Sequence, residues 1–474
     1  MNYIDEREKI KPKVGEKCFF ALNARMHGPM RNRKQHTLVV PPDVERLLET
    51  VYRTGFDVWL VGGAIRDFLL GLPPKDWDLA TEASPQDVIR LFPRVIPVGI
   101  RHDTVQVHTG EKTVEVTSCQ TQGTAGIVGD LGRRDFTVNA LAMGYPDKQI
   151  IDPFDGRRDL QAGILRAVGD ARSRFGEDPL RTLRAGRFVS VYGFSIDENT
   201  FEALKDMANR LAQVAAERIR EEMYKLLLGG NVFSAFEWMR RGGVLQAIFP
   251  EILEGYQDEP DRSTRKDIYS HLVRSVQLCP QNLRVRLAAL FHDIGKPRVR
   301  TLLRGKILYP DHHRMSGLLA VEILTRWRGS GKTVREVVKL VEKHISTSVH
   351  DWTDAQIRRL MAETGLELLS DLLDLAYADR LSGQSSADCL AEINSLRRRV
   401  QLQIEAQPPL QIGDLAIDGN DLMKALSLNP GPRIGEILHK LHRLVLDDPT
   451  MNERRILLDY ARKEVSTESF SDVT

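Results

Sequence analysis

Residues 61–80 read V-G-G-A-I-R-D-F-L-L-G-L-P-P-K-D-W-D-L-A, and this stretch decides the fold expected for the first third of the chain. The apolar run 56–61 predicts a strand, and Gly62-Gly63 predicts a turn into a helix that begins at about Ala64. At such a helix start, backbone N–H groups without a neighbouring Cβ can approach an anion closely. The stretch therefore predicts a strand, an anion-binding turn and a helix.

Two acidic residues, Asp76 and Asp78, flank Trp77 at the end of this stretch. In an extended strand, residues i and i+2 point to the same face, so the two carboxylates are expected to converge. Two close carboxylates are unfavourable unless a cation lies between them, and Mg²⁺ prefers oxygen ligands. A D-x-D pair alone is common in turns. The combination with the preceding glycine turn is what indicates a metal site for phosphoryl transfer.

The overall composition sets limits on the class of protein. The chain has 474 residues, which predicts three or more domains. Its formal net charge is only +2, so any RNA site must be a local basic patch. The four cysteines form no C-x-x-C pair, which argues against a zinc ribbon or a disulfide framework. Without a signal pattern or a membrane-length apolar stretch, we expect a cytoplasmic protein with no membrane partner.

The pattern of apolar residues changes at about residue 175, and the predicted fold class is α+β. Before this point, Ser84-Pro85 predicts a helix start, and 104–108 with 113–117 predicts a strand pair joined at Gly110. Further strand material is expected at 138–143. After this point, helical spacing predicts helices over 179–191, 199–228, 232–241, 266–278, 283–292, 315–327, 333–345, 355–379 and 387–404.

We expect five segments in chain order. They are a basic and flexible extension (1–40), a head with a mixed β-sheet and flanking helices (41–175), a helical neck (176–245), a second helical domain (246–400) and a helical tail (401–474). The basic extension is expected to be solvated rather than an RNA-gripping arm. In the tail, Gly431-Pro432 predicts a helix start that either lies against a phosphate of an RNA partner or is an ordinary capped surface helix.

A third motif, Glu177-Asp178-Pro179, opens the first helix of the neck. Pro179 suits the first helical position, so Asp178 is expected to be the N-cap. Arg181 and Arg184 follow on the same helical face. An acceptor beside a bidentate donor can hydrogen-bond the Watson–Crick edge of a base, and capping alone does not need the arginines.

Several motifs together resemble one family. Residues 59–82 are similar to the signature of the bacterial tRNA nucleotidyltransferase and poly(A) polymerase family, within the polymerase-β-like nucleotidyltransferase superfamily. The resemblance continues in the family's order through R-R-D-F-T-V-N-A at 133–140, D-P-F-D-G at 152–156 and G-E-D-P-L-R-T-L-R-A-G-R-F at 176–188. It covers roughly residues 40–245. The resemblance implies transfer of nucleotides from CTP, and possibly ATP, to the 3′ end of tRNA without a nucleic-acid template.

The resemblance also implies roles for individual residues. Asp76 and Asp78 would hold two Mg²⁺ ions, and Glu115 is either an accessory carboxylate or an outward charge on its strand. The other nucleotide-binding residues fall into three groups. The first group, Gly62, Gly63 and Arg66, would cradle phosphate, and the second, Arg134 and Asp135, would hold the triphosphate and the ribose. In the third group Asp178 and Arg181, next to Glu177, would select the base, and Arg184 and Arg187 would contact phosphate or support the selecting residues.

One segment departs from the family pattern. Residues 118–130 read S-C-Q-T-Q-G-T-A-G-I-V-G-D, whereas CCA-adding relatives carry a longer flexible loop here that helps to switch the pocket from CTP to ATP. A shortened loop is typical of relatives that add only the two cytidines. We therefore hold CC-only addition open beside full CCA addition, because loops also vary in length harmlessly.

A separate set of histidines and aspartates lies on the later helices. His292-Asp293 ends an apolar helical run, and the other candidate ligands are His271, His313, His344 and Asp379, with His312 as the alternative to its neighbour. Imidazole and carboxylate groups from several helices suit a divalent transition metal or Mg²⁺ and activate water against phosphate esters. The pattern resembles the HD phosphohydrolase superfamily.

Two other functions remain as alternatives at this point. The first is a poly(A) polymerase, which shares the same catalytic motifs. The second is an HD phosphohydrolase that acts on RNA ends and carries an inactive head. The intact Asp76, Asp78, Arg134 and Arg181 argue against the second alternative.

Overall fold

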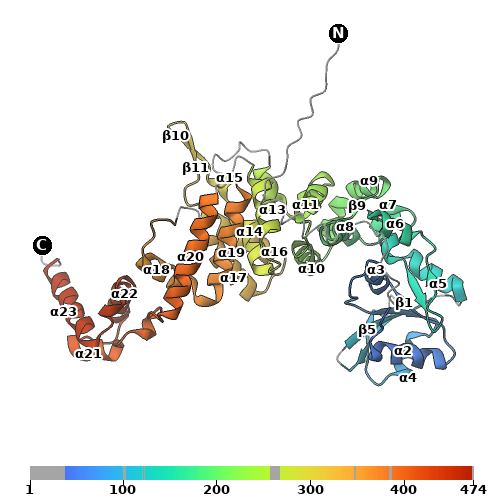
Figure 1. The fold of residues 1–474 in the computed structure, drawn as a ribbon, viewed down its shortest axis with the longest axis horizontal. Coiled ribbons are helices and arrows are strands. Elements are labelled where there is room, and N and C mark those ends of the chain that lie inside the picture. The colour runs from blue at the N-terminus through green and yellow to red at the C-terminus, as the bar shows by residue number, and fades with distance from the viewer. Residues whose placement is uncertain are drawn as a thin grey trace, which may run out of the picture. The chain divides into compact units, whose positions relative to one another are not determined.

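The structure is a computed structural model of the full chain. It describes residues 38–99, 103–110, 112–119, 121, 123–256, 267–345, 349–383 and 387–471. The chain forms two compact units, Met1–Gly169 and Asp170–Thr474 (Figure 1). Nearly all of the predicted basic extension lies outside the described residues.

The first unit is built on a mixed sheet of seven strands in the order β3-β4-β5-β2-β1-β6-β7. Strands β2 and β5 pair in parallel, and the other neighbours pair antiparallel, which confirms the predicted mixed sheet. The strands are β1 (Val58–Val61), β2 (Asp78–Thr81), β3 (Val95–Gly99), β4 (Thr104–Thr109), β5 (Lys112–Ser118), β6 (Ala142–Gly144) and β7 (Ile150–Ile151).

Helices flank this sheet. They are α2 (Pro42–Arg53), α3 (Gly63–Leu69), α4 (Pro85–Leu91), α5 (Gly123–Gly132) and α6 (Gly156–Ala162). Helix α4 begins as predicted, because the Ser84 hydroxyl accepts the Asp87 N–H and the Asp87 carboxylate accepts the Ser84 N–H in a capping box. Strand β1 is buried along its whole length, so the central strand carries apolar residues on both faces.

The register of the central strands positions the acidic residues. Asp78 is the first residue of β2 and pairs with Val61 at the end of β1 on one side. On the other side it pairs with Glu115 of β5. The sheet therefore brings the D-x-D motif and Glu115 to the edge where the Gly62 turn leaves β1.

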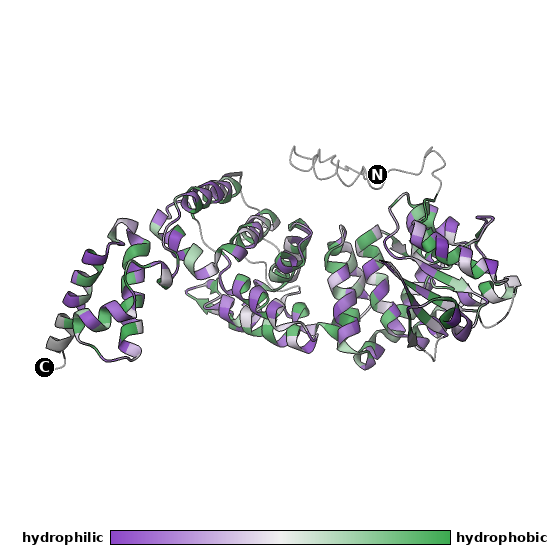
Figure 2. Cartoon of the chain, turned by 90° about the horizontal axis from the view of Figure 1, so that it is seen from below, coloured by the Kyte–Doolittle hydropathy of each residue, from purple (hydrophilic) through white to green (hydrophobic). Residues whose placement is uncertain are grey.

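The second unit is helical, and apolar and polar residues alternate around its helices (Figure 2). Its α-helices are α7 (Ala171–Glu177), α8 (Leu180–Tyr192), α9 (Glu198–Met207), α10 (Ala216–Leu227), α11 (Val232–Arg241), α12 (Val244–Ile248), α13 (Ile268–Leu278), α14 (Leu283–Phe291), α15 (Lys296–Val299), α16 (His312–Arg326), α17 (Gly331–Glu342), α18 (Asp354–Thr364), α19 (Leu366–Ser382), α20 (Ala387–Glu405), α21 (Gly419–Leu426), α22 (Pro432–Asp447) and α23 (Arg454–Ser471). None of the helices within the described residues has the length and apolarity needed to cross a bilayer.

Two predicted helices are wrong in length. The stretch 355–379 breaks at Gly365, which has φ +82° and ends α18, so α19 starts afresh. The stretch 199–228 is interrupted by a 3-10 turn at Ala208–Gln213. A short hairpin, β10 (Thr301–Leu303) with β11 (Lys306–Leu308), was not expected. The division of this unit into neck, second domain and tail remains a prediction.

Candidate functional site

The turn after β1 has the backbone that the glycine pair predicts. Gly62 has φ +71° and ψ −127°, and the next residue begins α3. A Cβ atom at Gly62 would lie 2.4 Å from Nη1 of Arg134 and 3.8 Å from Oδ2 of Asp78. Only glycine therefore lets the Arg134 guanidinium come this close to the turn.

Asp78 carries a carboxyl group whose pKa is shifted strongly upward. Burial raises the pKa of Asp78 to about 6, and the carboxylates of Glu115 and Asp76 push it in the same direction while Arg134 and Arg66 oppose them. Asp76 is exposed and lies in the extended segment before β2, not within the strand, because the strand begins at Asp78. The carboxylates of Glu115 and Asp76 thus both repel the carboxylate of Asp78, and a bound divalent cation would relieve this repulsion.

Arg134 and Arg66 are held by different partners. Arg134 donates through Nη2 and Nε to Oδ2 of Asp130, at 3.1 and 3.3 Å. Arg66 is buried and pairs with Asp67 at 2.8 Å, and its Nη1 donates to Oδ1 of Asn139 at 2.5 Å. Asp130, on α5, was not predicted as a partner of Arg134, although it lies only four residues before Arg134 in the chain.

Asp135 is joined to the same network. Its Oδ1 accepts from Nδ2 of Asn139 at 2.8 Å and from the N–H of Phe136 at 2.9 Å. Asn139 therefore links Asp135 to Arg66, and it was visible in the sequence as part of the R-R-D-F-T-V-N-A motif. Contacts of Arg66 and Asp135 with a nucleotide remain predictions.

The motif that was predicted to select the base lies in the second unit. Helix α8 begins at Leu180, one residue later than expected, yet Oδ1 of Asp178 accepts the Leu180 N–H at 3.2 Å. Oδ2 of Asp178 pairs with Nη2 of Arg218 on α10 at 2.8 Å. Arg181 donates to Glu177 at 3.2 Å. Arg218 was missed because it lies forty residues away in the chain.

Further along α8, Arg187 is anchored by a buried carboxylate. Its Nε and Nη1 lie 3.2 and 3.3 Å from the Glu222 carboxylate oxygens, and Glu222 is 5% exposed. The Arg187 guanidinium also lies 5.1 Å from the Phe188 ring centroid. This geometry favours the supporting role that was predicted as one option for Arg187. Arg184 is half-buried on the same helix.

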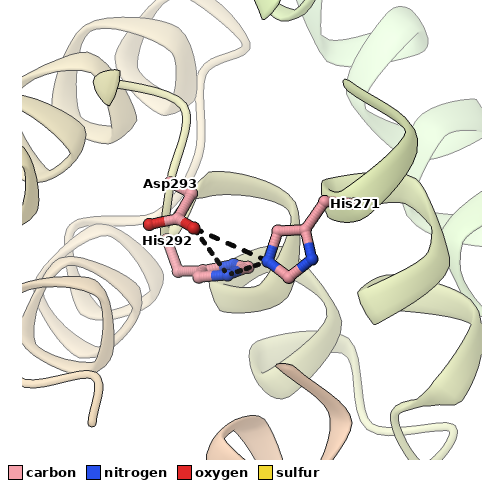
Figure 3. Close-up of side chains that lie close together, drawn as sticks. All are labelled: His271, His292 and Asp293. Carbon is pink, nitrogen blue, oxygen red and sulfur yellow. Dashed lines mark hydrogen bonds and ion pairs between the residues drawn. The ribbon is translucent and has the colours of Figure 1, made fainter. Parts of the chain in front are cut away.

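The second cluster gathers buried histidines and aspartates (Figure 3). His271 comes from α13, and His292 and Asp293 directly follow the end of α14. The Nε2 atoms of His271 and His292 lie 3.1 Å apart, and each is 3.5 Å from Oδ2 of Asp293. Oδ1 of Asp379, on α19, lies 3.0 Å from Nε2 of His271 and 3.5 Å from Nε2 of His292.

The other side of Asp293 faces two more histidines. Its Oδ1 lies 3.4 Å from Nε2 of His312 and 3.6 Å from Nε2 of His344. Of the two predicted alternatives, His313 belongs to neither group of possible ligands found among the described residues. Its neighbour His312, which begins α16, takes that place.

Charge in this cluster is unevenly divided. Burial would raise the pKa of Asp293, but Lys296 and the surrounding histidines hold it well below its ordinary value. Burial lowers the pKa of His344 to about 4, although Asp293 opposes this shift. An ionised carboxylate beside a neutral imidazole is the state in which both can bind a metal. The cluster therefore has the donor set of a divalent metal site.

The comparisons with known proteins agree with this arrangement. Three family descriptions match: "Poly A polymerase head domain" over 58–166, "Probable RNA and SrmB- binding site of polymerase A" over 193–255 and "tRNA nucleotidyltransferase domain 2 putative" over 313–461. The head is thus similar to the head domain of poly(A) polymerases, and the roles of its carboxylates remain predictions.

Similar proteins cover nearly the whole chain. A CCA-adding enzyme of Leuconostoc mesenteroides subsp. mesenteroides is 30% identical over 442 residues, which span 90% of this chain and 97% of that enzyme. One from Lactococcus lactis subsp. cremoris is 32% identical over 438 residues, covering 89% and 96%. The crystal structure of the Bacillus stearothermophilus CCA-adding enzyme in complex with CTP matches with a TM-score of 0.70 and 29% identity, over 91% of this chain and 100% of that one. The chain belongs to the CCA-adding enzyme family of tRNA nucleotidyltransferases.

Proposed function

We propose that the chain adds cytidines from CTP to the 3′ end of tRNA without a template, using two divalent ions held by Asp76 and Asp78. The observation that carries this proposal is the position of Asp78, which pairs with Glu115 in the sheet and lies beside the Gly62 turn. Burial, and then the carboxylates of Glu115 and Asp76, raise the pKa of Asp78 to about 6. A carboxylate held in this way is stabilised by a bound cation. Poly(A) synthesis is disfavoured because the relatives that match this chain over most of their own length are CCA-adding enzymes.

The proposed reaction joins the terminal 3′-oxygen of tRNA to the α-phosphorus of CTP and releases pyrophosphate and a proton. Bound Mg²⁺ would lower the pKa of the 3′-hydroxyl and neutralise the triphosphate. Asp76 and Asp78 would hold these ions in position. The Gly62 turn offers its backbone to phosphate oxygens, and Arg134, held by Asp130, offers its guanidinium to the triphosphate.

Asp178 and Arg181 would select the base. An aspartate oxygen accepts from the amino group of cytosine, and an arginine donates to its ring nitrogen and carbonyl. In the structure, Asp178 pairs with Arg218 and Arg181 pairs with Glu177, so these ion pairs orient both side chains before a base arrives. We expect hydrogen bonds to the incoming base to replace some of these ion-pair contacts.

We further propose that the chain adds only the two cytidines. Strand β5 ends at Ser118 and α5 begins at Gly123, so residues 119–122 alone connect them. The glycine-rich segment expected to be a shortened flexible loop is therefore largely helical. Ile127 and Leu131 of α5 are fully buried in the head core, which leaves little chain to rearrange for ATP.

One assay tests both parts of the proposal. Transfer RNA that lacks its CCA end is incubated with CTP alone, with ATP alone and with both nucleotides. We expect addition of two cytidines with CTP and no further extension when ATP is added. Efficient adenosine addition after the cytidines would refute CC-only synthesis, and retained cytidine addition by Asp76→Ala would refute the metal-ligand assignment.

A second activity is favoured by the buried histidine cluster. We infer that the second unit hydrolyses a phosphate ester at an RNA end, for which a 2′,3′-cyclic or terminal phosphate is the suitable class. The supporting observation is that four histidines and two aspartates from five helices or helix ends converge there. Hydrolysis of a 2′,3′-cyclic phosphate by wild type but not by His292→Ala, with nucleotide addition kept, tests this activity.

A further inference from the structure

The hairpin β10–β11 carries apolar side chains that its own unit leaves exposed. Its strands pair Leu302 with Ile307 and Leu303 with Lys306, and residues opposite each other in an antiparallel pair share a face. Leu302 therefore lies on one face, and Leu303 and Leu308 lie on the other. These three residues are 75%, 58% and 43% exposed, and Figure 1 shows the hairpin standing out beyond the neighbouring helices. Neighbouring exposed apolar residues of this kind indicate a surface that contacts a partner.

The segment around the hairpin is strongly basic. Residues 294–310 contain five basic residues and no acidic residue, although the formal net charge of the whole chain is only +2. The five are Lys296, Arg298, Arg300, Arg304 and Lys306. Before the hairpin, Nζ of Lys296 lies 2.8 Å from Oδ2 of Asp293. Nη2 of Arg298 lies 2.7 Å from Oε1 of Glu254. Carboxylates therefore offset the positive charge in the segment that leads into the hairpin.

The two basic residues nearest the turn of the hairpin lack this compensation. Arg304 and Lys306 are both exposed, and neither forms an ion pair with a carboxylate in the described part of the chain. Lys306 also shares its face with Leu303 and Leu308. The hairpin thus presents uncompensated positive charge beside apolar side chains. A partner that complements it carries negative charge and some apolar surface.

The backbone of the turn does not explain the arginine. Arg304 and Gly305 have φ of +50° and +72°, and a two-residue hairpin turn of this kind needs a positive φ at both positions. Asparagine followed by glycine is the preferred pair in such a turn, and other side chains adopt a left-handed backbone less readily. The turn alone would favour asparagine at position 304, so the guanidinium group is the feature that needs a reason.

RNA fits this surface better than an acidic protein does. Guanidinium and ammonium groups bind phosphate oxygens, which RNA presents at regular spacing along its backbone. The wide and shallow minor groove of an A-form helix also exposes ribose, against which leucine side chains can pack. Residues 294–308 include no aromatic side chain on which a base could stack, so the contact is expected to be with the backbone and to be independent of sequence.

We propose that the hairpin β10–β11 binds the sugar-phosphate backbone of the tRNA substrate. Arg304 and Lys306 contact phosphates, and Leu303 and Leu308 pack against ribose. This contact goes beyond the proposed function, because it supplies affinity for the body of the RNA and takes part in neither nucleotide addition nor ester hydrolysis.

The salt dependence of tRNA binding by the full chain tests the proposal, with tRNA that lacks its CCA end as the probe and no CTP present. The variant Arg304→Asn/Lys306→Thr removes both charges, yet asparagine suits the turn and threonine suits a strand, so the hairpin is kept. We expect binding to be about 10-fold weaker at about 0.1 M salt, and the slope of log Kd against log salt to fall by about two. The control Lys332→Gln/Arg335→Gln removes the same charge from the exposed face of α17 and should bind as the wild type does.

The apolar part of the contact has its own variant. Leu303→Ser/Leu308→Ser should weaken tRNA binding by a few-fold and leave the salt slope unchanged, because no phosphate contact is lost. In cytidine addition, both hairpin variants should raise the KM for tRNA and keep the wild-type kcat, since the hairpin touches no reacting atom.

A chemical measurement on the wild type needs no variant. Saturating tRNA should protect Lys306 from an amine-reactive reagent and leave the exposed Lys332 as reactive as before. Equal reactivity of Lys306 with and without tRNA would overturn the proposal. So would an unchanged Kd and salt slope in Arg304→Asn/Lys306→Thr, which would indicate an acidic protein as the partner of the hairpin. Because binding is measured without CTP, these results do not depend on whether the chain adds one, two or three nucleotides.

Discussion

Replacing Asp78 with asparagine should abolish nucleotide addition and yet stabilise the metal-free protein at neutral pH. Burial raises the pKa of Asp78 from 3.8 to about 6, with help from Glu115 and Asp76. Between these two pH values the folded state keeps a proton that the unfolded state releases, so the free energy of unfolding falls as pH rises through this window. Above about pH 6 the full penalty is present.

The size of the effect follows from the pKa difference. About two pH units at about 1.36 kcal/mol each give an upper bound of about 3 kcal/mol, which we halve to about 1.5 kcal/mol because Asp78 is only half-buried. In a unit of this size, that corresponds to a rise in melting temperature of roughly 3–6 °C. Asparagine has a similar volume, so no cavity offsets the gain.

Thermal unfolding in EDTA at pH 7.5 measures this gain, and a repeat at pH 4.5 should show most of it lost. The control is Asp76→Asn, because Asp76 is exposed and should give no comparable gain while also losing activity. Added Mg²⁺ should stabilise the wild type and not Asp78→Asn. An Asp78→Asn variant that melts at or below the wild-type temperature in EDTA at pH 7.5 would refute the electrostatic reasoning.

Three further predictions concern residues and ions around the head and neck. Gly62→Ala should lower the rate of cytidine addition by about 100-fold, because the new Cβ would lie 2.4 Å from Nη1 of Arg134 and would push the guanidinium aside. In the control variant Gly129→Ala, the new Cβ meets no atom within 4 Å, so this variant should keep full activity. Arg218→Ala should cost less than about 1 kcal/mol of stability because this ion pair is half-exposed, but it should reduce the kcat/KM preference for CTP over UTP by about 10-fold by releasing Asp178. EDTA should stop cytidine addition completely, and excess Mg²⁺ should restore it in a primer-extension assay.

The sequence was most informative where a local rule determines the structure. The Gly62 turn needs a positive φ, and Ser84 with Pro85 and Asp87 makes a capping box, so both could be read directly from residue types. The alternation of Val105 and Val107 likewise predicted the strand pair, because buried and less buried residues alternate along a strand that packs one face against the core.

Prediction failed where tertiary contacts decide. Gly126 and its neighbouring glycines disfavour a helix, yet α5 forms because Ile127 and Leu131 are buried against the sheet. A Cβ at Gly126 would lie 1.8 Å from the carbonyl oxygen of Thr121, so this glycine permits a close approach of two backbones. The sequence shows neither contact.

The choice between His312 and His313 shows the same limit. Neighbouring residues on a helix point about 100° apart, so the rotation of α16 about its axis decides which ring enters the cluster. The helix begins at His312, three residues before the predicted start, and its rotation is set by the face that it buries, which includes Leu319 and Ile323. Ion pairs between distant helices, such as Asp178 with Arg218, are equally invisible until the helices are packed.

The most direct test of the central claim is a crystal of the full chain grown with Mn²⁺ and CTP and measured at the manganese absorption edge. We predict anomalous peaks bonded to the carboxylates of Asp76 and Asp78, with the triphosphate beside the Gly62 turn. A bound triphosphate with no manganese at these two aspartates would contradict the account.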